Sequence, residues 1–212
     1  MADDETAGRR VYVVDDDEAV RESLAALLEA RSYTVRTFEL ARDFLIAAPT
    51  LQPGCLVADI RMPGMDGLEL QQKLNERSFN FPLIVITGHG DVPLAVRAMK
   101  AGALDFIEKP FAADAIIGSV DAALQRSTAS SGAGSDALAA SAVAGLALLS
   151  PREREVLQGL LAGLPNKSIA YDLAISPRTV EIHRARVMDK MGAKSLPELI
   201  RKSLAAGVRP RG

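Results

Sequence analysis

Five polar side chains stand at or near the ends of apolar segments. These are Asp15 and Asp16 after VYVV (11–14), Asp59 in LVADI (56–60), Thr87 in PLIVIT (82–87) and Lys109 in DFIEK (105–109). Three carboxylates in one crevice would repel one another unless a hard divalent cation bound them, and Mg2+ (or Mn2+) fits such oxygen ligands. Asp59 could then attack phosphorus, while Lys109 and the Thr87 hydroxyl bind the phosphoryl oxygens. The set predicts phosphoryl transfer to Asp59.

The elements that must position these residues alternate between strand-like and helix-like patterns. A further apolar run, TVRTF at 34–38, brings the predicted strands to five, and each is followed by a helical pattern such as AVRESLAALLEA at 19–30. This rhythm predicts a parallel α/β sheet with helices on both faces. The carboxyl ends of its strands then share one edge, where the five polar residues would meet.

The polar residues near these strand ends also have purely structural interpretations. Asp17 suits the N-cap of the helix that follows, and Asp pairs at strand ends often do no more than this. Lys109 could form a surface ion pair, and Thr87 could be a turn residue. Their joint presence at the ends of alternating strands favours a site.

Composition bounds the rest of the chain. Its 212 residues, 48% of them apolar, are enough for two compact domains. No segment has the length and apolarity of a membrane span or a secretory signal, so we expect a cytoplasmic protein without a membrane partner. The single cysteine, Cys55, suggests a buried small side chain.

Charge divides the chain unevenly. Residues 1–127 hold 13 Lys and Arg against 20 Asp and Glu, whereas residues 128–212 hold 12 against 7. A basic C-terminal part suits a polyanion such as DNA. We predict a tail at 1–9, an α/β domain at 10–127, an Ala/Ser/Gly-rich linker at 128–148 that could be part helical, and a DNA-binding domain at 149–212.

Four short helices are predicted in the last domain, at about 151–162, 166–174, 177–191 and 196–206. Ser150 with Glu153, and Ser195 with Glu198, have the spacing of N-terminal capping boxes. Ser176 marks another helix start. Gly163 and Gly192 mark helix ends.

The first domain resembles the receiver domain of the FixJ group of response regulators, a flavodoxin-like (CheY-like) fold, over about residues 10–126. The resemblance rests on VDDD (14–17), DIRMPGMDG (59–67), VITGHGDVP (85–93) and AMKAGALDFIEKPF (98–111). It implies that Asp59 accepts the phosphoryl group, that Asp15, Asp16, Asp59 and the backbone carbonyl of Arg61 hold Mg2+, and that Thr87 and Lys109 bind the phosphoryl group. It also implies a cis bond before Pro110.

The same resemblance suggests how a signal leaves the pocket. Phe106 matches the family's switch aromatic that follows Thr87, although it could equally be an ordinary core residue. The face formed by the predicted helix 91–102 and strand 105–109 would mediate dimerisation on phosphorylation, with Val96, Lys100 and Asp105 as candidates. His89 is expected to order its loop rather than to catalyse.

Residues 149–200 resemble the LuxR-type helix-turn-helix, with Ala174-Ile175-Ser176 as the short turn before the recognition helix. Helical periodicity places Val180, Val187 and Met191 on the core side, with His183 near it. The predicted reading face comprises Arg178, Glu181, Ile182, Ala185 and Arg186, with Thr179 as a further DNA contact. Lys167, Arg184 and Lys190 are expected to bind phosphates. By family analogy, the last helix would dimerise DNA-bound domains on an inverted repeat.

The sequence therefore predicts a transcription factor of a phosphorelay and not an enzyme, apart from phosphoryl acceptance and slow self-dephosphorylation. A sensor histidine kinase would phosphorylate Asp59, and the homodimer would bind double-stranded promoter DNA and engage RNA polymerase. One alternative is a Mg2+-dependent phosphatase, but Arg61 stands where such enzymes carry a second carboxylate. Another is a DNA-binding regulator that does not depend on phosphorylation.

Overall fold

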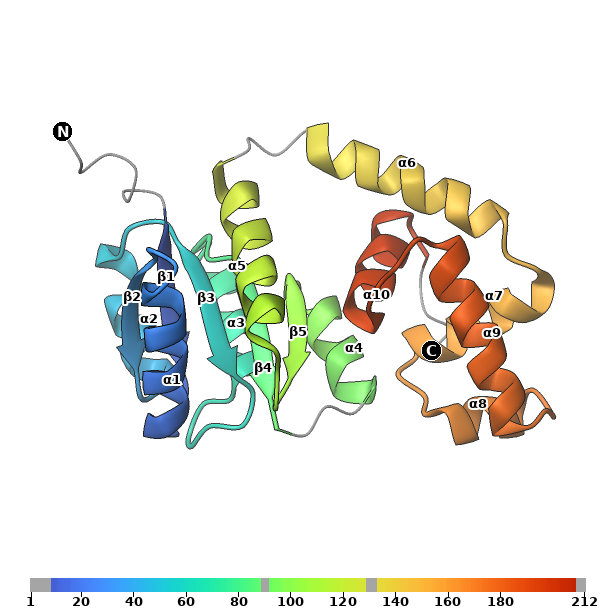
Figure 1. Ribbon diagram of the computed structural model, residues 1–212, viewed down its shortest axis with the longest axis horizontal. Coiled ribbons are helices and arrows are strands. Elements are labelled where there is room, and N and C mark those ends of the chain that lie inside the picture. Colours follow the sequence, from blue (N-terminus) through green and yellow to red (C-terminus); the bar gives the residue numbers. More distant parts are fainter. Residues whose placement is uncertain (1–8, 89–91, 129–132, 209–212) are drawn as a thin grey trace. The chain divides into compact units, whose positions relative to one another are not determined.

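The structure, a computed structural model, describes residues 9–88, 92–128 and 133–208 (Figure 1). The chain divides into two compact units, one of residues 1–90 with 101–130 and the other of residues 91–100 with 131–212. Among the described helices, none combines the length and the apolarity needed to cross a bilayer.

The first unit is built on five parallel strands in the order β2-β1-β3-β4-β5. The strands are β1 (Arg10–Val14), β2 (Thr34–Phe38), β3 (Cys55–Asp59), β4 (Leu83–Thr87) and β5 (Asp105–Glu108). The helices of this unit are α1 (Glu18–Glu29), α2 (Ala41–Ala47), the short 3-10 turn η1 (Ala48–Thr50), α3 (Gly67–Glu76) and α5 (Ala113–Thr128). The predicted flavodoxin-like class is confirmed, and β1 and β3 flank the point where the strand order reverses.

Alternation along β1 explains how the sheet is covered on both faces. Val11 and Val13 belong to a buried cluster with residues of α1 and α5, including Leu24 and Ile116. Tyr12 points to the other face, where its ring lies 5.7 Å from Phe44 of α2. Figure 1 shows α1 and α5 on one side of the sheet and α2 and α3 on the other.

Cys55 at the start of β3 is fully buried, as its apolar neighbours predict. Burial raises the pKa of its thiol far above the ordinary value, because the thiolate would lose its hydration. The side chain is therefore a packing residue of the sheet.

The second unit is helical. It contains α4 (Val92–Lys100), α6 (Ala133–Ala147), α7 (Pro151–Leu161), α8 (Asn166–Asp172), α9 (Pro177–Lys190) and α10 (Leu196–Ala205). The four helices expected beyond residue 149 are all present, with ends within two residues of prediction. Much of the Ala/Ser/Gly-rich segment forms α6. The domain boundaries drawn from the sequence remain a prediction.

Local signals explain where these helices start and stop. Ser150 and Glu153 form the predicted capping box, because the Glu153 carboxylate accepts from the Ser150 N–H at 2.8 Å and the Ser150 hydroxyl accepts from the Glu153 N–H. Ser195 caps α10, but Glu198 accepts from the Lys194 N–H instead of closing a box. Gly163, one of the two predicted stops, has φ of 79°, in the left-handed region that favours glycine.

Candidate functional site

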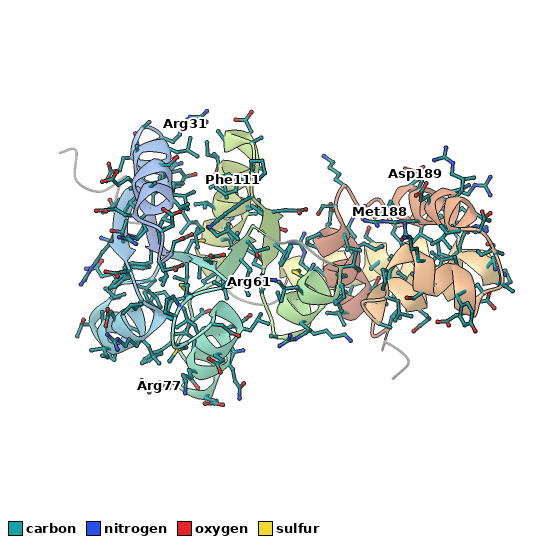
Figure 2. All side chains as sticks on the ribbon, turned by 90° about the horizontal axis from the view of Figure 1, so that it is seen from below. Arg31, Arg61, Arg77, Phe111, Met188 and Asp189 are labelled. Atoms are coloured by element: carbon teal, nitrogen blue, oxygen red, sulfur yellow. The ribbon has the colours of Figure 1, made fainter. Side chains whose placement is uncertain are left out.

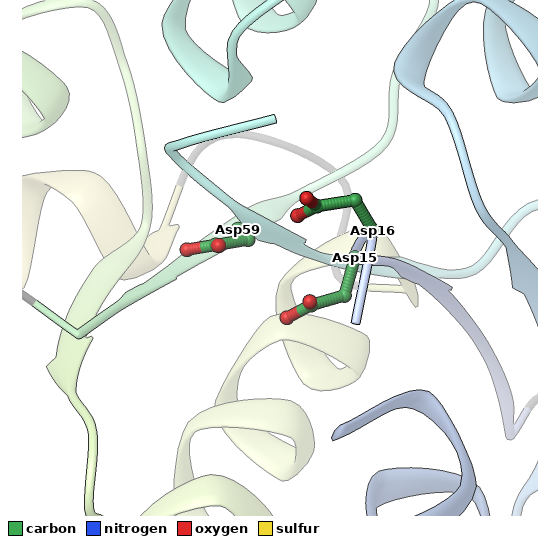
Figure 3. Close-up of side chains that lie close together, drawn as sticks. All are labelled: Asp15, Asp16 and Asp59. Atoms are coloured by element: carbon green, nitrogen blue, oxygen red, sulfur yellow. The ribbon is translucent and has the colours of Figure 1, made fainter. Parts of the chain in front are cut away.

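Three carboxylates converge at the carboxyl ends of β1 and β3 (Figure 3). One oxygen from each of Asp15, Asp16 and Asp59 lies within 4.8 Å of the others. Asp15 and Asp59 are buried, whereas Asp16 is exposed. The Asp17 N–H donates to Asp15 at 3.0 Å, and the Ile60 N–H donates to Asp59 at 2.9 Å. Backbone donors therefore fix two of the three carboxylates.

Among the described residues, Lys109 is the only cation that forms an ion pair with these carboxylates. Its ammonium lies 2.7 Å from Asp15 and 3.6 Å from Asp59. The Lys109 N–H also donates to the Thr87 carbonyl at 2.7 Å, which ties the ends of β4 and β5 together. The Thr87 side chain is fully buried at this edge, and the bond between Lys109 and Pro110 is cis, as the resemblance implied.

The pocket holds more negative than positive charge. Burial raises the pKa of Asp59 above its ordinary value, and the nearby Asp15 carboxylate adds to this, while Lys109 opposes it. A crowded, oxygen-only donor set of this kind fits a hard divalent cation, which would relieve the repulsion. Arg61, two residues after Asp59, is exposed in the loop that follows β3 (Figure 2).

Two residues that the sequence did not single out, Gly67 and Arg21, support the pocket. A Cβ at Gly67 would lie 2.4 Å from the Asp59 carbonyl oxygen, closer than real Cβ contacts, so only glycine fits the start of α3. The Arg21 guanidinium donates to the backbone carbonyls of Asp15 and Asp16 at 2.8 and 3.0 Å. Neither contact has a signature in residue spacing, because both join segments through the backbone.

Asp17 takes the structural role that competed with a functional one. Its carboxylate accepts from the N–H groups of Ala19 and Val20 and caps α1. Asp17 is not part of the three-carboxylate group. The acidic run at 15–17 thus serves two purposes, the pocket and the helix cap.

The residues of the predicted switch and dimer face differ in how exposed their side chains are. Phe106 is half-buried on β5, and Lys100 at the end of α4 is exposed. Val96 is only 2% exposed, since it packs among the helices of the second unit. The Asp105 carboxylate accepts from the Ser119 hydroxyl at 2.5 Å. His89 lies outside the described residues.

In the second unit, α8 and α9 are joined by a short turn at residues 173–176. Ala174 adopts a positive φ of 52°, and Ser176 then caps α9 by accepting from the Thr179 N–H at 3.0 Å. Val180, Val187 and Met191 are buried, as predicted for the core side of this helix. This arrangement has the form of a helix-turn-helix.

The predicted reading face of α9 is accessible. All five of its members are exposed, namely Arg178, Glu181, Ile182, Ala185 and Arg186. Arg178 and Glu181 form an ion pair of 3.0 Å across one helical turn. Ile182 is 44% exposed, and its apolar side chain suits contact with a thymine methyl.

The three predicted phosphate contacts lie in different surroundings. Lys167 is exposed at the start of α8, and Arg184 is half-buried. The Lys190 ammonium is 2.7 Å from the buried Glu153 carboxylate. Histidine 183 is half-buried, with an Nδ1 atom that has no hydrogen-bond partner among the described residues.

Two family models match the chain, and together they cover most of it. Residues 11–121 match the response regulator receiver domain, which is just over half of the chain. Residues 147–203 match the luxR family of bacterial regulatory proteins. The first match contains the acidic pocket, and the second contains the helix-turn-helix.

Relatives match over nearly the whole length. The transcriptional regulatory protein FixJ of Azorhizobium caulinodans is 57% identical over 202 residues, 94% of each chain. FixJ of Bradyrhizobium diazoefficiens is 49% identical over 96% of this chain and 98% of that protein. The crystal structure of full-length FixJ from B. japonicum has 49% identity and a TM-score of 0.56, covering 93% of this chain and 97% of that one.

Proposed function

Because the chain belongs to the FixJ-like response regulators, transcriptional regulators of two-component systems with a receiver and a LuxR-type DNA-binding domain, we propose that Asp59 is its phosphorylation site. The observation that carries this proposal is the meeting of Asp15, Asp16 and Asp59 within 4.8 Å, with Lys109 in contact. A sensor histidine kinase would be the phosphodonor.

In this mechanism an Asp59 carboxylate oxygen attacks the phosphorus of the kinase's phosphohistidine. The new P–O bond forms on Asp59 as the P–N bond breaks, and the imidazole leaves with the electron pair. Lys109 can follow the developing charge, because its ammonium already lies 3.6 Å from Asp59. The buried Thr87 hydroxyl would turn toward a phosphoryl oxygen. Slow self-dephosphorylation would end the signal.

Asp15, Asp16, Asp59 and the backbone carbonyl of Arg61 would hold Mg2+ or Mn2+. When bound, the cation would neutralise charge on the phosphoryl oxygens. The chain's own contribution is to hold the carboxylates in place through backbone N–H donors and to keep Asp15 paired with Lys109.

Asp59→Asn tests the proposal. With acetyl phosphate and Mg2+, we expect wild type to gain one phosphoryl group by intact mass and to dimerise, and Asp59→Asn to do neither. The matched control is Asp17→Asn, which removes the same charge at the residue that follows Asp16 but lies outside the three-carboxylate group, while Asn can still cap α1. Phosphorylation of Asp59→Asn to the wild-type extent would refute the assignment.

We further propose that phosphorylation produces a homodimer that binds promoter DNA in the cytoplasm and engages RNA polymerase. Thr87 and Phe106 would pass the signal to a face that includes Val96, Lys100 and Asp105. Since Val96 is 2% exposed, its use in a dimer requires that α4 first separate from the helices that cover it.

The proposed DNA contacts are of two kinds. The reading face of α9, with Thr179 beside it, would contact bases, and Lys167 and Arg184 would contact phosphates. The reading face comprises Arg178, Glu181, Ile182, Ala185 and Arg186. A salt titration of promoter binding tests this, because each phosphate contact adds about 0.9 to the slope of log affinity against log salt. Lys167→Met should lower that slope by about one such unit. A flat wild-type titration would overturn the proposal.

A further inference from the structure

Three elements meet at the C-terminal end of the recognition helix α9. They are the first turn of α7, the last half of α10 and the end of α6, all within the second unit. None of the contacts that they make there uses the reading face of α9. The end of the helix is therefore fixed by a set of interactions separate from those available for bases.

The first of these contacts is the ion pair between Lys190 and Glu153. The two charged atoms are 2.7 Å apart, and Glu153 is 3% exposed. Glu153 also closes the capping box with Ser150, so the carboxylate is held by α7 itself. The Lys190 hydrogen bond is the main reason why the pKa of Glu153 falls to about 2. The Lys190 ammonium therefore has an anionic partner within the protein, although 37% of the lysine side chain is exposed.

The second contact comes from Lys202 of α10. Its ammonium donates to the carbonyls of Met191, at 3.2 Å, and Gly192, and it pairs with Glu198 at 3.1 Å. The Lys202 side chain is only 11% exposed. The last carbonyls of a helix lack intrahelical donors and carry partial negative charge, so a cation here stabilises the end of α9.

The third contact is a close approach of α6. A Cβ at Gly145 would lie 2.9 Å from the Lys190 carbonyl oxygen and 3.1 Å from the Met191 Cα. The backbone of α6 therefore rests directly on the last turn of α9. Glycine at position 145 allows this approach.

The length of α9 makes the fixed end important. Arg178 lies twelve residues before Lys190, which is about 18 Å along the helix. A rotation of about 5° at the fixed end would move Arg178 by about 1.5 Å. Hydrogen bonds to base edges tolerate displacements of only about 0.5 Å.

We propose that Lys190 and Lys202 are positioning residues that orient the recognition helix, and that Lys190 is not a phosphate contact. This inference rests on the proposed reading of DNA by α9, and it revises the expectation that Lys190 binds a phosphate. It separates two groups of cations in the second unit. Lys167 is exposed at the start of α8. The Lys190 ammonium contacts the buried Glu153 carboxylate although 37% of its side chain is exposed, and the Lys202 side chain is only 11% exposed.

The experiment uses the full-length protein and two duplexes, one selected by the wild type from a random-sequence library and one of unrelated sequence. Lys190→Met and Lys202→Met should each weaken binding to the selected duplex at least tenfold. Their affinity for the unrelated duplex and their salt slope should match those of wild type. Lys190→Arg and Lys202→Arg, which keep a cation in place, should restore affinity.

Glu153→Gln provides a second measurement, because Glu153 is buried and cannot touch DNA. Glu153→Gln should weaken binding to the selected duplex as much as Lys190→Met does. The double variant should lose no more affinity than either single variant. Lys167→Met is the control for a true phosphate contact, and it should lower the salt slope of binding to both duplexes. Helical circular dichroism verifies folding, and Lys202→Met carries the test if Lys190→Met does not fold.

A salt slope lowered by about 0.9 in Lys190→Met on both duplexes would make Lys190 a phosphate contact and overturn the proposal. Unchanged affinity of both methionine variants would also overturn it. Failure of the underlying function looks different, because the wild type itself would then select no sequence or show no dependence on salt.

Discussion

Gly67→Ala should damage the phosphorylation pocket through a single methyl group. The added Cβ would start 2.4 Å from the Asp59 carbonyl oxygen and 3.1 Å from the Ile60 Cα, both of them backbone atoms at the end of β3, which carries Asp59. Relief of this clash requires the distance from the Cβ to the Asp59 oxygen to grow to at least 3.0 Å, so α3 or the end of β3 must shift. Overpacking of this kind costs about 2 kcal/mol of unfolding free energy.

The displacement also reaches the chemistry. The Gly67 N–H donates to the Ile60 carbonyl at 2.9 Å, and the Ile60 N–H donates to the Asp59 carboxylate. A shift of α3 is therefore transmitted to the nucleophile. Since misplacement by about 1 Å can cost up to a hundredfold in rate, we expect phosphorylation by acetyl phosphate to slow at least tenfold.

Gly118→Ala is the matched control. Gly118 lies on the exposed side of α5, and a Cβ there meets no heavy atom within 4 Å. This change should stabilise the protein by about 1 kcal/mol through helix propensity and leave phosphorylation intact. Urea unfolding followed by far-UV circular dichroism and phosphate-affinity gels measure the two effects. Equal stability and equal phosphorylation of Gly67→Ala and wild type would refute the reasoning.

Two further predictions concern the second unit. Because the Lys190 ammonium, together with the Ser150 N–H, lowers the folded pKa of Glu153 from 4.5 to about 2, these contacts should contribute stability above pH 4.5 and lose it as the pH falls toward 2. Hydrogen exchange in α7 should therefore show Glu153→Gln less protected than wild type at neutral pH, by about 2 kcal/mol, with a difference that narrows on acidification; a constant difference would contradict this. Ala174 has a left-handed φ of 52°, so Ala174→Gly should raise the unfolding free energy by about 0.5–1 kcal/mol, while Ala185→Gly, inside α9, should lower it; a destabilised Ala174→Gly would show that the turn is not strained.

The sequence by itself determined the positions of the helices and strands and the kinds of side chain at the site. Strand positions follow from the apolar runs, and helix starts from Ser150 and Ser176, because these signals act within a few residues. The carboxylates near the ends of strands could be predicted to meet, since parallel strands share an edge. The two matched families follow from the same motifs.

Tertiary structure alone decided which charged groups remain available. Lys190 and Lys167 look alike in the sequence and both are exposed, yet the Lys190 ammonium is held by Glu153, a buried carboxylate 37 residues away. The requirement for glycine at position 67 depends in the same way on a backbone oxygen of another segment. Helical periodicity assigns a side chain to a face, but only packing determines what covers that face, because the covering groups come from distant parts of the chain.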